Sequence, residues 1–366
     1  MSIMVTPTRA TSKSTKTWAE KIYNPVGFTK GYNFALYFIF GGAMVGFCLA
    51  RFMYLNFDNN FCPSTPSGDG NGAAPGECYY FLNFDRYKIG ILLHLASVLP
   101  AGILAVMQFT PYIRHRWIMV HRISGYFAIL LYAISLVGAL MIARHSFGGG
   151  LDVQAWIGFV GTGVLVCFII SYINIRRLQI EQHRAWMLRG WFYAGAIITN
   201  RLIMIIAAMI ISKQEYFVAW PCTKIESTFS DASEFLSSYP SCAAYINGTD
   251  LTEFALVNAS MDGPGGANAG AALNVPFGMA LWLSVVIHAI GVEIYLHLTP
   301  KEAQRLRQVS YQRQLEAGLR NPGSAGLTSD RLGDAEKWTP EQQPRLASTG
   351  TAVSTVSTVN VSQETK

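Results

Sequence analysis

Charged side chains are scarce in this chain. Only 14% of its 366 residues are Asp, Glu, Lys or Arg, whereas an ordinary soluble domain has about 25%. Hydrophobic residues make up 51%. This balance excludes a disordered protein, a small disulfide-stapled protein and most soluble enzymes, and it is typical of a membrane protein.

Several catalytic and cofactor-binding motifs are missing. The chain has no HExxH, no CxxC and no glycine-rich phosphate loop, so zinc-protease, thioredoxin-like and P-loop chemistries lack their residue spacing. The connections on the predicted inner side are too short to hold a dinucleotide-binding domain. A reductant would therefore have to arrive by diffusion or from a partner.

Six apolar stretches are long enough to cross a membrane, because a hydrocarbon core of about 30 Å needs roughly 20 helical residues. An open sheet edge is not tolerated in lipid, so we predict an all-α polytopic bundle of six transmembrane helices. In the first span, Gly42 and Gly46 have the GxxxG spacing that lets helices approach closely. The predicted spans, within a membrane domain of residues 32–298, are 32–53, 88–109, 120–142, 153–174, 187–212 and 275–297.

Lys and Arg concentrate on one side of this domain, which predicts its orientation. Residues 1–31 carry five of them against one Glu, and the connections after the second and fourth spans are also basic. Loops 54–87 and 213–274 are acidic, with four acidic residues against one Arg and seven against two Lys. We therefore expect both termini, including an N-terminal arm of residues 1–31, in the cytosol.

Four cysteines fall in the two loops that this orientation places outside. Cys62 and Cys78 lie in the first of these loops, and Cys222 and Cys242 in the long second one. Oxidising compartments permit disulfides there. Four cysteines allow three pairings, of which we favour pairing within each loop.

Glycosylation sequons support the same orientation. Asn247 and Asn258 each begin an acceptor sequence in the long outside loop. A third sequon, at Asn360, falls on the predicted cytosolic side. The outside cysteines and sequons together predict a multi-pass glycoprotein of a eukaryotic secretory-pathway or plasma membrane.

The chain after the sixth span divides into two parts. Residues 299–317 have the pattern of an amphipathic juxtamembrane helix, which either lies on anionic lipid or extends into solvent. From residue 318 to 366 the sequence is rich in Ser, Thr, Gly and Pro. We predict that residues 318–366 form a disordered cytosolic tail.

Four of the seven histidines lie within or at the start of predicted spans. His94 is in the second, His121 opens the third, His183 precedes the fifth and His288 is in the sixth. An ionisable residue at membrane depth is costly, so it indicates function by default. The alternative, which stays open, is that each neutral imidazole bonds a neighbouring helix.

Two short motifs at span starts resemble the signature of a known family. The third span opens with His-Arg-x-x-Gly from His121, and the fifth with His-Arg-x-Trp-Met-x-Arg from His183. Over roughly residues 88–298 the chain looks like a fungal-type member of the domain of unknown function 2306 family of predicted multispanning membrane proteins. That family is distantly similar to transmembrane b-type cytochromes, so the resemblance implies a membrane fold and haem b held by histidines.

Depth decides which histidines can pair around one iron, because bis-histidine ligation needs two imidazoles at the same level. His121 and His183 both lie near the predicted cytosolic face and form the first pair of candidate iron ligands. At the helical rise, His94 lies ~6 Å outside its span's midpoint and His288 ~3 Å inside, roughly 9 Å apart. This mismatch argues against two haems and leaves one haem or none open.

Arg201 lies within the fifth span, next to Asn200 and at about the depth of His94. An Arg at that depth must pair, line a wet cavity or extend to the interface. The three residues predict a polar layer for a haem propionate, a substrate carboxylate or water, with interhelical bonds to carbonyls as the alternative. Glu293 of the sixth span is expected to meet Arg122 or Arg184.

Two hypotheses of function follow. The first is a membrane redox protein of b-cytochrome type, an oxidoreductase if it is an enzyme. Its first candidate haem ligands are His121 and His183, its second His94 and His288, and Arg201 is the anion partner. The second is a cofactor-free carrier or accessory membrane subunit, with His94, Asn200 and Arg201 lining a polar cavity. The expected partners are the lipid bilayer and a cytosolic electron donor or a small-molecule substrate, without nucleic acid.

Overall fold

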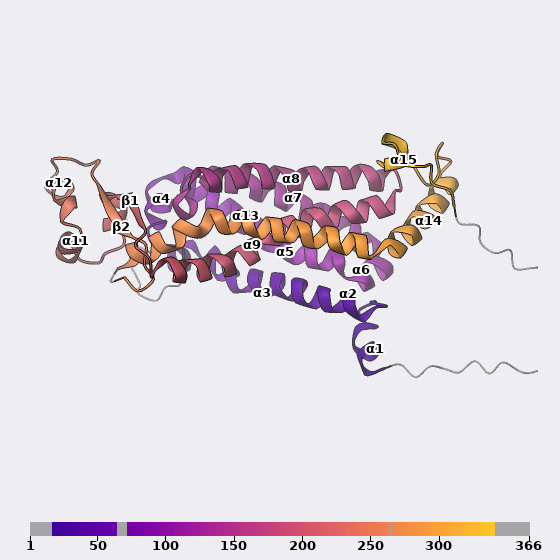
Figure 1. Cartoon of the computed structure of the whole chain (residues 1–366), viewed down its shortest axis with the longest axis horizontal. Helices are drawn as coiled ribbons and strands as arrows, with labels where there is room; N and C mark the ends of the chain where they lie inside the picture. The colour runs from indigo at the N-terminus through magenta and orange to yellow at the C-terminus, as the bar shows by residue number, and fades with distance from the viewer. Residues whose placement is uncertain (1–16, 64–71, 264, 341–366) are drawn as a thin grey trace, which may run out of the picture.

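Six long helices lie side by side in the computed structural model, which describes residues 17–63, 72–263 and 265–340 (Figure 1). Each is long and apolar enough to cross a membrane. The prediction of an all-α bundle with six spans is therefore confirmed. The spans are Gly31–Leu55, Asp85–Phe109, Ile118–Ile142, Leu151–Arg176, Ile180–Ile211 and Gly266–Leu298.

The elements follow one another along the described chain in a simple up-and-down order. The first span is composite, with a π-helical turn at Tyr37–Gly41 between α2 and α3. The helices are α1 (Trp18–Tyr23), α2 (Gly31–Leu36), α3 (Gly42–Arg51), α4 (Cys78–Asn83), α5 (Asp85–Phe109), α6 (Pro111–Arg116), α7 (Ile118–Ile142), α8 (Leu151–Arg176), α9 (Ile180–Ile211), α10 (Cys222–Glu226), α11 (Ala232–Ser238), α12 (Ala243–Ile246), α13 (Gly266–Leu298), α14 (Pro300–Glu316) and α15 (Ser329–Leu332), and the strands are β1 (Phe217–Pro221) and β2 (Phe254–Asn258).

The spans pack mainly as two pairs, α5 with α7 and α9 with α13, while α8 packs against α9. The α5–α7 crossing is tight because Gly138 has no side chain: a Cβ there would lie 2.6 Å from the Gly90 carbonyl oxygen and 2.7 Å from the His94 backbone nitrogen. Gly42 and Gly46, the pair predicted to pack closely, have no neighbour within 4 Å of such a Cβ. Their spacing alone did not identify the real crossing.

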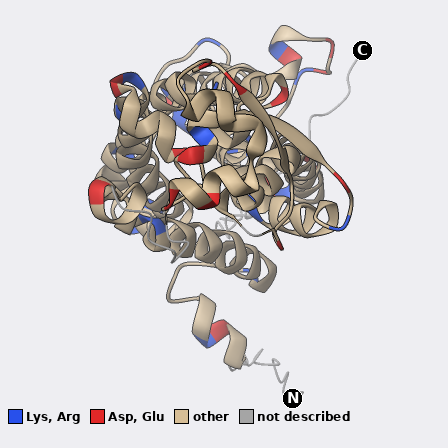
Figure 2. Ribbon diagram, turned by 90° about the vertical axis from the view of Figure 1, so that its left-hand side faces the viewer, with Lys and Arg blue, Asp and Glu red and all other residues tan. Residues whose placement is uncertain are grey.

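The two ends of the bundle differ in build. We call the end that carries residues 54–63, 72–84 and 212–263 the loop end, and the end that carries α1 and α14 the terminal end (Figure 1). Figure 2 looks onto the loop end and shows the helices side by side, with α1 standing away from them. Both ends of the described chain lie at the terminal end, as an even number of spans requires. That the terminal end faces the cytosol stays a prediction.

The loop end is a small folded cap. Disulfides join Cys62 to Cys78 and Cys222 to Cys242, so the favoured pairing within each loop is confirmed. In the long loop, β1 and β2 form an antiparallel two-stranded sheet in which Phe217 pairs with Asn258, an element that the hydropathy pattern did not predict. Its core contains the buried side chains of Trp220, Cys222, Ile225, Phe235, Cys242 and Val257.

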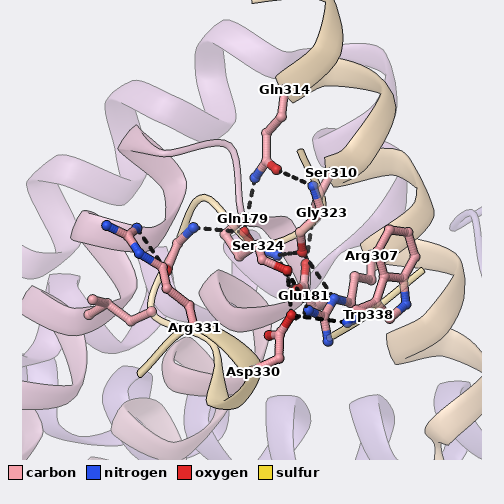
Figure 3. A network of polar contacts seen from close by, with 12 residues as sticks. Gln179, Glu181, Arg307, Ser310, Gln314, Gly323, Ser324, Asp330, Arg331 and Trp338 are labelled. Atoms are coloured by element: carbon pink, nitrogen blue, oxygen red, sulfur yellow. Dashed lines mark hydrogen bonds and ion pairs between the residues drawn. The ribbon is translucent and has the colours of Figure 1, made fainter. Parts of the chain in front are cut away.

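The terminal end differs from the predicted disordered tail. Residues 318–340 are folded, and they close over α14 and the turn between α8 and α9 (Figure 3). Gln179 is fully buried at that turn, and its side-chain oxygen Oε1 accepts from the Gly326 backbone N–H at 2.8 Å. The buried Asp330 carboxylate pairs with Arg307 at 2.7 Å. Side chains from earlier in the chain therefore provide hydrogen-bond and ion-pair partners for these Gly- and Ser-rich residues. Residues 341–366 of the predicted tail lie outside the described residues.

We expect Gly138→Ala to lower stability, because the added methyl group meets backbone atoms that cannot move aside. Overpacking of this kind costs about 1–3 kcal/mol. The measurement is the thermal unfolding midpoint of the purified chain in detergent. It is monitored by the loss of the monodisperse peak in size-exclusion chromatography.

Gly163→Ala is the matched control, since a Cβ at Gly163 has nothing within 4 Å and alanine favours the helix over glycine. Its midpoint should stay unchanged or rise. Equal midpoints for the two variants would contradict the close approach of α5 and α7.

Candidate functional site

His288 ties two helices together through both of its ring nitrogens. Its Nδ1 lies 2.7 Å from the Phe192 carbonyl oxygen and its Nε2 lies 2.8 Å from the Thr199 hydroxyl, both on α9. The imidazole is 8% exposed. In this arrangement neither nitrogen is free to bind iron, so His288 does not fit the role of a haem ligand.

His94 makes the corresponding tie between α5 and α7. Its Nδ1 lies 2.9 Å from the Ser135 hydroxyl and 3.1 Å from the Ser135 carbonyl oxygen. Ser135 is itself buried. His94 and His288 thus each bond a helix of their own pair, and the structure does not bring them together as ligands.

His121 and His183 are placed differently, near the terminal end. The Nδ1 of His183 lies 2.7 Å from the Ser171 hydroxyl and 3.2 Å from the Ser171 carbonyl oxygen on α8. The amide of Gln108 lies 2.9 Å from Nδ1 of His121. The two histidines are close enough to interact electrostatically.

His121 and His183 share one feature with metal-bound imidazoles. Each engages its Nδ1 and leaves its Nε2 without a hydrogen bond to a described residue, and a metal-bound imidazole normally has its second nitrogen oriented in this way. Among the described residues no group of three His, Cys, Asp or Glu is placed to hold a metal ion. Haem ligation, which uses two, would rest on His121 and His183.

The Arg201 side chain lies inside the bundle near its loop end, where it contacts aromatic rings rather than a carboxylate. Its guanidinium lies 4.3 Å from the centroid of the Phe147 ring and 5.3 Å from that of Phe277, and its Nη1 lies 3.8 Å from the Met204 sulfur. Within the described residues it has no carboxylate within 4 Å. Such contacts with ring faces stabilise a desolvated guanidinium only in part.

Several polar groups on α8, α9 and α13 are buried without a hydrogen-bond partner among the described residues. The side-chain amides of Asn200 on α9 and Asn274 on α13 form no hydrogen bond to a described residue, and neither does the indole N–H of Trp156 on α8. Asn200 is fully buried. Because buried polar groups in native proteins are almost always paired, this set marks a place where water or a ligand belongs.

Two further charges lie beside this set, and sequence reasoning missed both. Glu77 is 4% exposed and Lys224 is 3% exposed. Burial raises the pKa of the Glu77 carboxyl, although a hydrogen bond from the Phe147 backbone N–H and the charges of Arg201 and Lys224 oppose this. Burial lowers the pKa of Lys224 to about 8, against the effect of Glu77.

The disulfides explain how these charges come to be buried. Glu77 directly precedes Cys78 and Lys224 follows Cys222 by two residues. The two segments touch, since a Cβ at Gly76 would lie 2.8 Å from the Lys224 side chain. An ionisable residue next to a buried disulfide was the sequence signal that could have identified them.

The turn that carries Phe147 completes the arrangement. Phe147 has a φ of 47°, a left-handed conformation that is uncommon outside glycine and that concentrates at functional sites. This turn points the Phe147 N–H at Glu77 and stacks its ring on Phe277 at 4.2 Å. We call Glu77, Asn200, Arg201, Lys224 and Asn274 the loop-end site; it holds two cationic side chains and one carboxyl group.

One predicted ion pair has a different partner. Glu293 accepts two hydrogen bonds from Arg189, at 2.6 and 3.0 Å, instead of meeting Arg122 or Arg184. Arg189 lies on α9, the helix that packs along α13. The pair therefore links these two helices.

Residues 91–222 match a family described as "Predicted membrane protein (DUF2306)". The match confirms the resemblance inferred from the two His-Arg motifs, and it covers a little over a third of the chain. It includes His94, His121, His183 and Arg201.

One similar protein is "Ava biosynthesis cluster protein G" of Aspergillus versicolor. It is 23% identical over 329 residues, which cover 78% of this chain and 94% of that protein. No solved structure matches.

Proposed function

We propose that this integral membrane protein binds a small organic anion with an apolar body at the loop-end site, as a carrier or an accessory subunit. The observations that support this most are the buried side-chain amides of Asn200 and Asn274, which have no hydrogen-bond partner among the described residues, and the Arg201 guanidinium, which contacts aromatic rings at the same end of the bundle. Arg offers a carboxylate two parallel N–H donors, and an amide N–H within reach would add a third.

The charge balance favours an anion over a neutral ligand. Arg201 and Lys224 face the single carboxyl of Glu77, so one buried cation lacks a counter-charge. Burying an unpaired charge costs several kcal/mol, and a bound anion would relieve that cost.

The surrounding side chains favour an apolar body on that anion. Phe147, Trp156, Met204 and Phe277 belong to one apolar cluster beside the donors. Ligand sites of this kind combine an apolar lining with a few placed polar groups. The name of the similar fungal protein refers to a biosynthesis cluster, which agrees with a small-molecule ligand.

We expect dodecanoate to raise the unfolding midpoint of the purified chain in a neutral maltoside detergent, and dodecanol to raise it much less. Arg201→Gln should lose most of the dodecanoate effect, because a hydrogen bond to a charged group contributes about 1.5–3 kcal/mol. Titrations of the midpoint against ligand concentration give the affinities.

Lys213→Gln is the matched control, since Lys213 also lies at the loop end but forms an exposed pair with Asp262 at 2.6 Å. It removes the same charge and should leave the dodecanoate effect intact. The proposal fails if Arg201→Gln and Lys213→Gln respond to dodecanoate alike.

A second candidate function is b-type electron transfer through one haem held by His121 and His183. It is favoured by the Ser171 contacts, which orient His183 through Nδ1. Bound haem would supply one-electron chemistry. The chain's own contribution would be to hold the two imidazoles, with Gln108 fixing the ring of His121.

For this candidate we expect the purified protein to show the narrow reduced-minus-oxidised bands of low-spin b haem. His121→Ala and His183→Ala should each remove the bands, whereas His288→Ala should keep them because both ring nitrogens of His288 bond α9. A colourless, folded wild-type protein from haem-replete cells would eliminate the candidate.

We also infer that the loop end faces the lumen or the exterior and is N-glycosylated. The two disulfides at that end and the exposed Asn247 and Asn258 support this. Digestion with an endoglycosidase should lower the apparent mass on a gel of the protein from eukaryotic cells by the mass of two glycans. Asn247→Gln and Asn258→Gln should each remove one of these two glycans. Asn360→Gln should change nothing, and a glycan on Asn360 would reverse the orientation.

A further inference from the structure

The terminal end holds a cluster of cationic side chains that neither candidate function uses. Arg114 on α6 is half-buried, and its charged neighbours are Arg184 of α9 together with Arg305 and Glu302 of α14. Burial lowers the pKa of the Arg114 guanidinium, and the Arg184 charge lowers it further. Arg114 is thus within electrostatic reach of charged side chains on α9 and α14.

The carboxylate in this cluster is already engaged. Glu302 accepts two hydrogen bonds from Arg305, both at 2.8 Å. Arg184 donates to the Tyr295 hydroxyl at 3.0 Å, and neither Arg114 nor Arg184 forms an ion pair with a carboxylate among the described residues. Their donors are therefore available to an external anion.

The framework around these donors is fixed by the buried network of Figure 3. Ser310 of α14 donates to Glu181 at 2.8 Å, and Gln314 donates to Gln179 at 2.9 Å. These bonds hold α14 against the beginning of α9, so Arg305 and Glu302 keep their place beside Arg184. A preorganised set of donors binds with less loss of side-chain entropy than a mobile one.

Two residues of the cluster lie at the ends of spans, where the headgroups of a bilayer are expected. Arg184 is in the second turn of α9 and Tyr295 is in the last turn of α13, so both are at span ends. On the same connection as Arg114, an open apolar groove of about 540 Å³ is lined by Arg116, Trp117, Ile118, Met119 and Val120. Trp117 is 54% exposed there, as is usual for an interfacial aromatic.

We propose that Arg114 and Arg184 bind the phosphate of an anionic phospholipid, with an acyl chain of that lipid along the groove. Guanidinium groups recognise phosphate through paired N–H donors. The Tyr295 hydroxyl donates to the Asn33 side-chain oxygen at 3.1 Å. Because it also accepts from Arg184, it holds that guanidinium in position. This site is at the opposite end from the loop-end site and does not rest on the proposed function.

The test measures binding of dioleoyl phosphatidic acid to the full chain in maltoside detergent, by native mass spectrometry and by the unfolding midpoint. Wild type should bind it in preference to dioleoyl phosphatidylcholine. In Arg114→Gln and in Arg184→Gln the affinity should fall at least about tenfold, since each removes a charge-assisted contact.

Arg176→Gln is the control, because Arg176 is exposed at the same end of the bundle and its loss changes the net charge equally. It should bind phosphatidic acid like wild type. If Arg114→Gln does not fold, Arg184→Gln and Arg184→Lys decide the question, and the Lys variant should recover only part of the affinity.

Three results would overturn the proposal. The first is equal affinity for phosphatidic acid in wild type and in folded Arg184→Gln. The second is an equal response to phosphatidylcholine, which would show that the anionic headgroup is not recognised. The third is an equal stabilisation by inorganic phosphate without lipid, which would assign the cluster to free phosphate.

Discussion

In the hydrocarbon region of a membrane no water is present to satisfy a polar group, so each one must find a partner inside the protein. This constraint explains how the intramembrane histidines are used. His94 bonds Ser135 across the α5–α7 pair, and His288 bonds the Phe192 carbonyl and Thr199 across the α9–α13 pair. The two helix pairs that form most of the bundle each contain one such bond.

The same constraint gives meaning to its exceptions. At the loop end, the amides of Asn200 and Asn274 are buried with neither nitrogen nor oxygen partnered by a described residue. Retaining such groups lowers stability unless something else completes them. The loop-end site therefore differs from the helix ties in kind, and that difference supports a binding role there and a structural role for His288.

The sequence was sufficient to predict the spans, because they depend on apolar length. It allowed three disulfide pairings, and the favoured one, within each loop, is the one observed. It was not sufficient for contacts that depend on how helices meet. Gly42 and Gly46 had the expected spacing, yet the close approach is at Gly138. Glu77 and Lys224 look like solvated loop charges until the disulfides bring their segments together, and the ring partners of the histidines are visible only in three dimensions.

The folded segment after α14 has a consequence for the order of assembly. Gly326 and Leu327 supply backbone N–H groups to Gln179 and Asn174, at 2.8 Å in each case, across 147 and 153 residues of chain. The turn between the fourth and fifth spans therefore carries buried amides whose partners are synthesised long after it enters the membrane. The full set of hydrogen bonds at that turn can therefore form only after residues 326 and 327 have been synthesised.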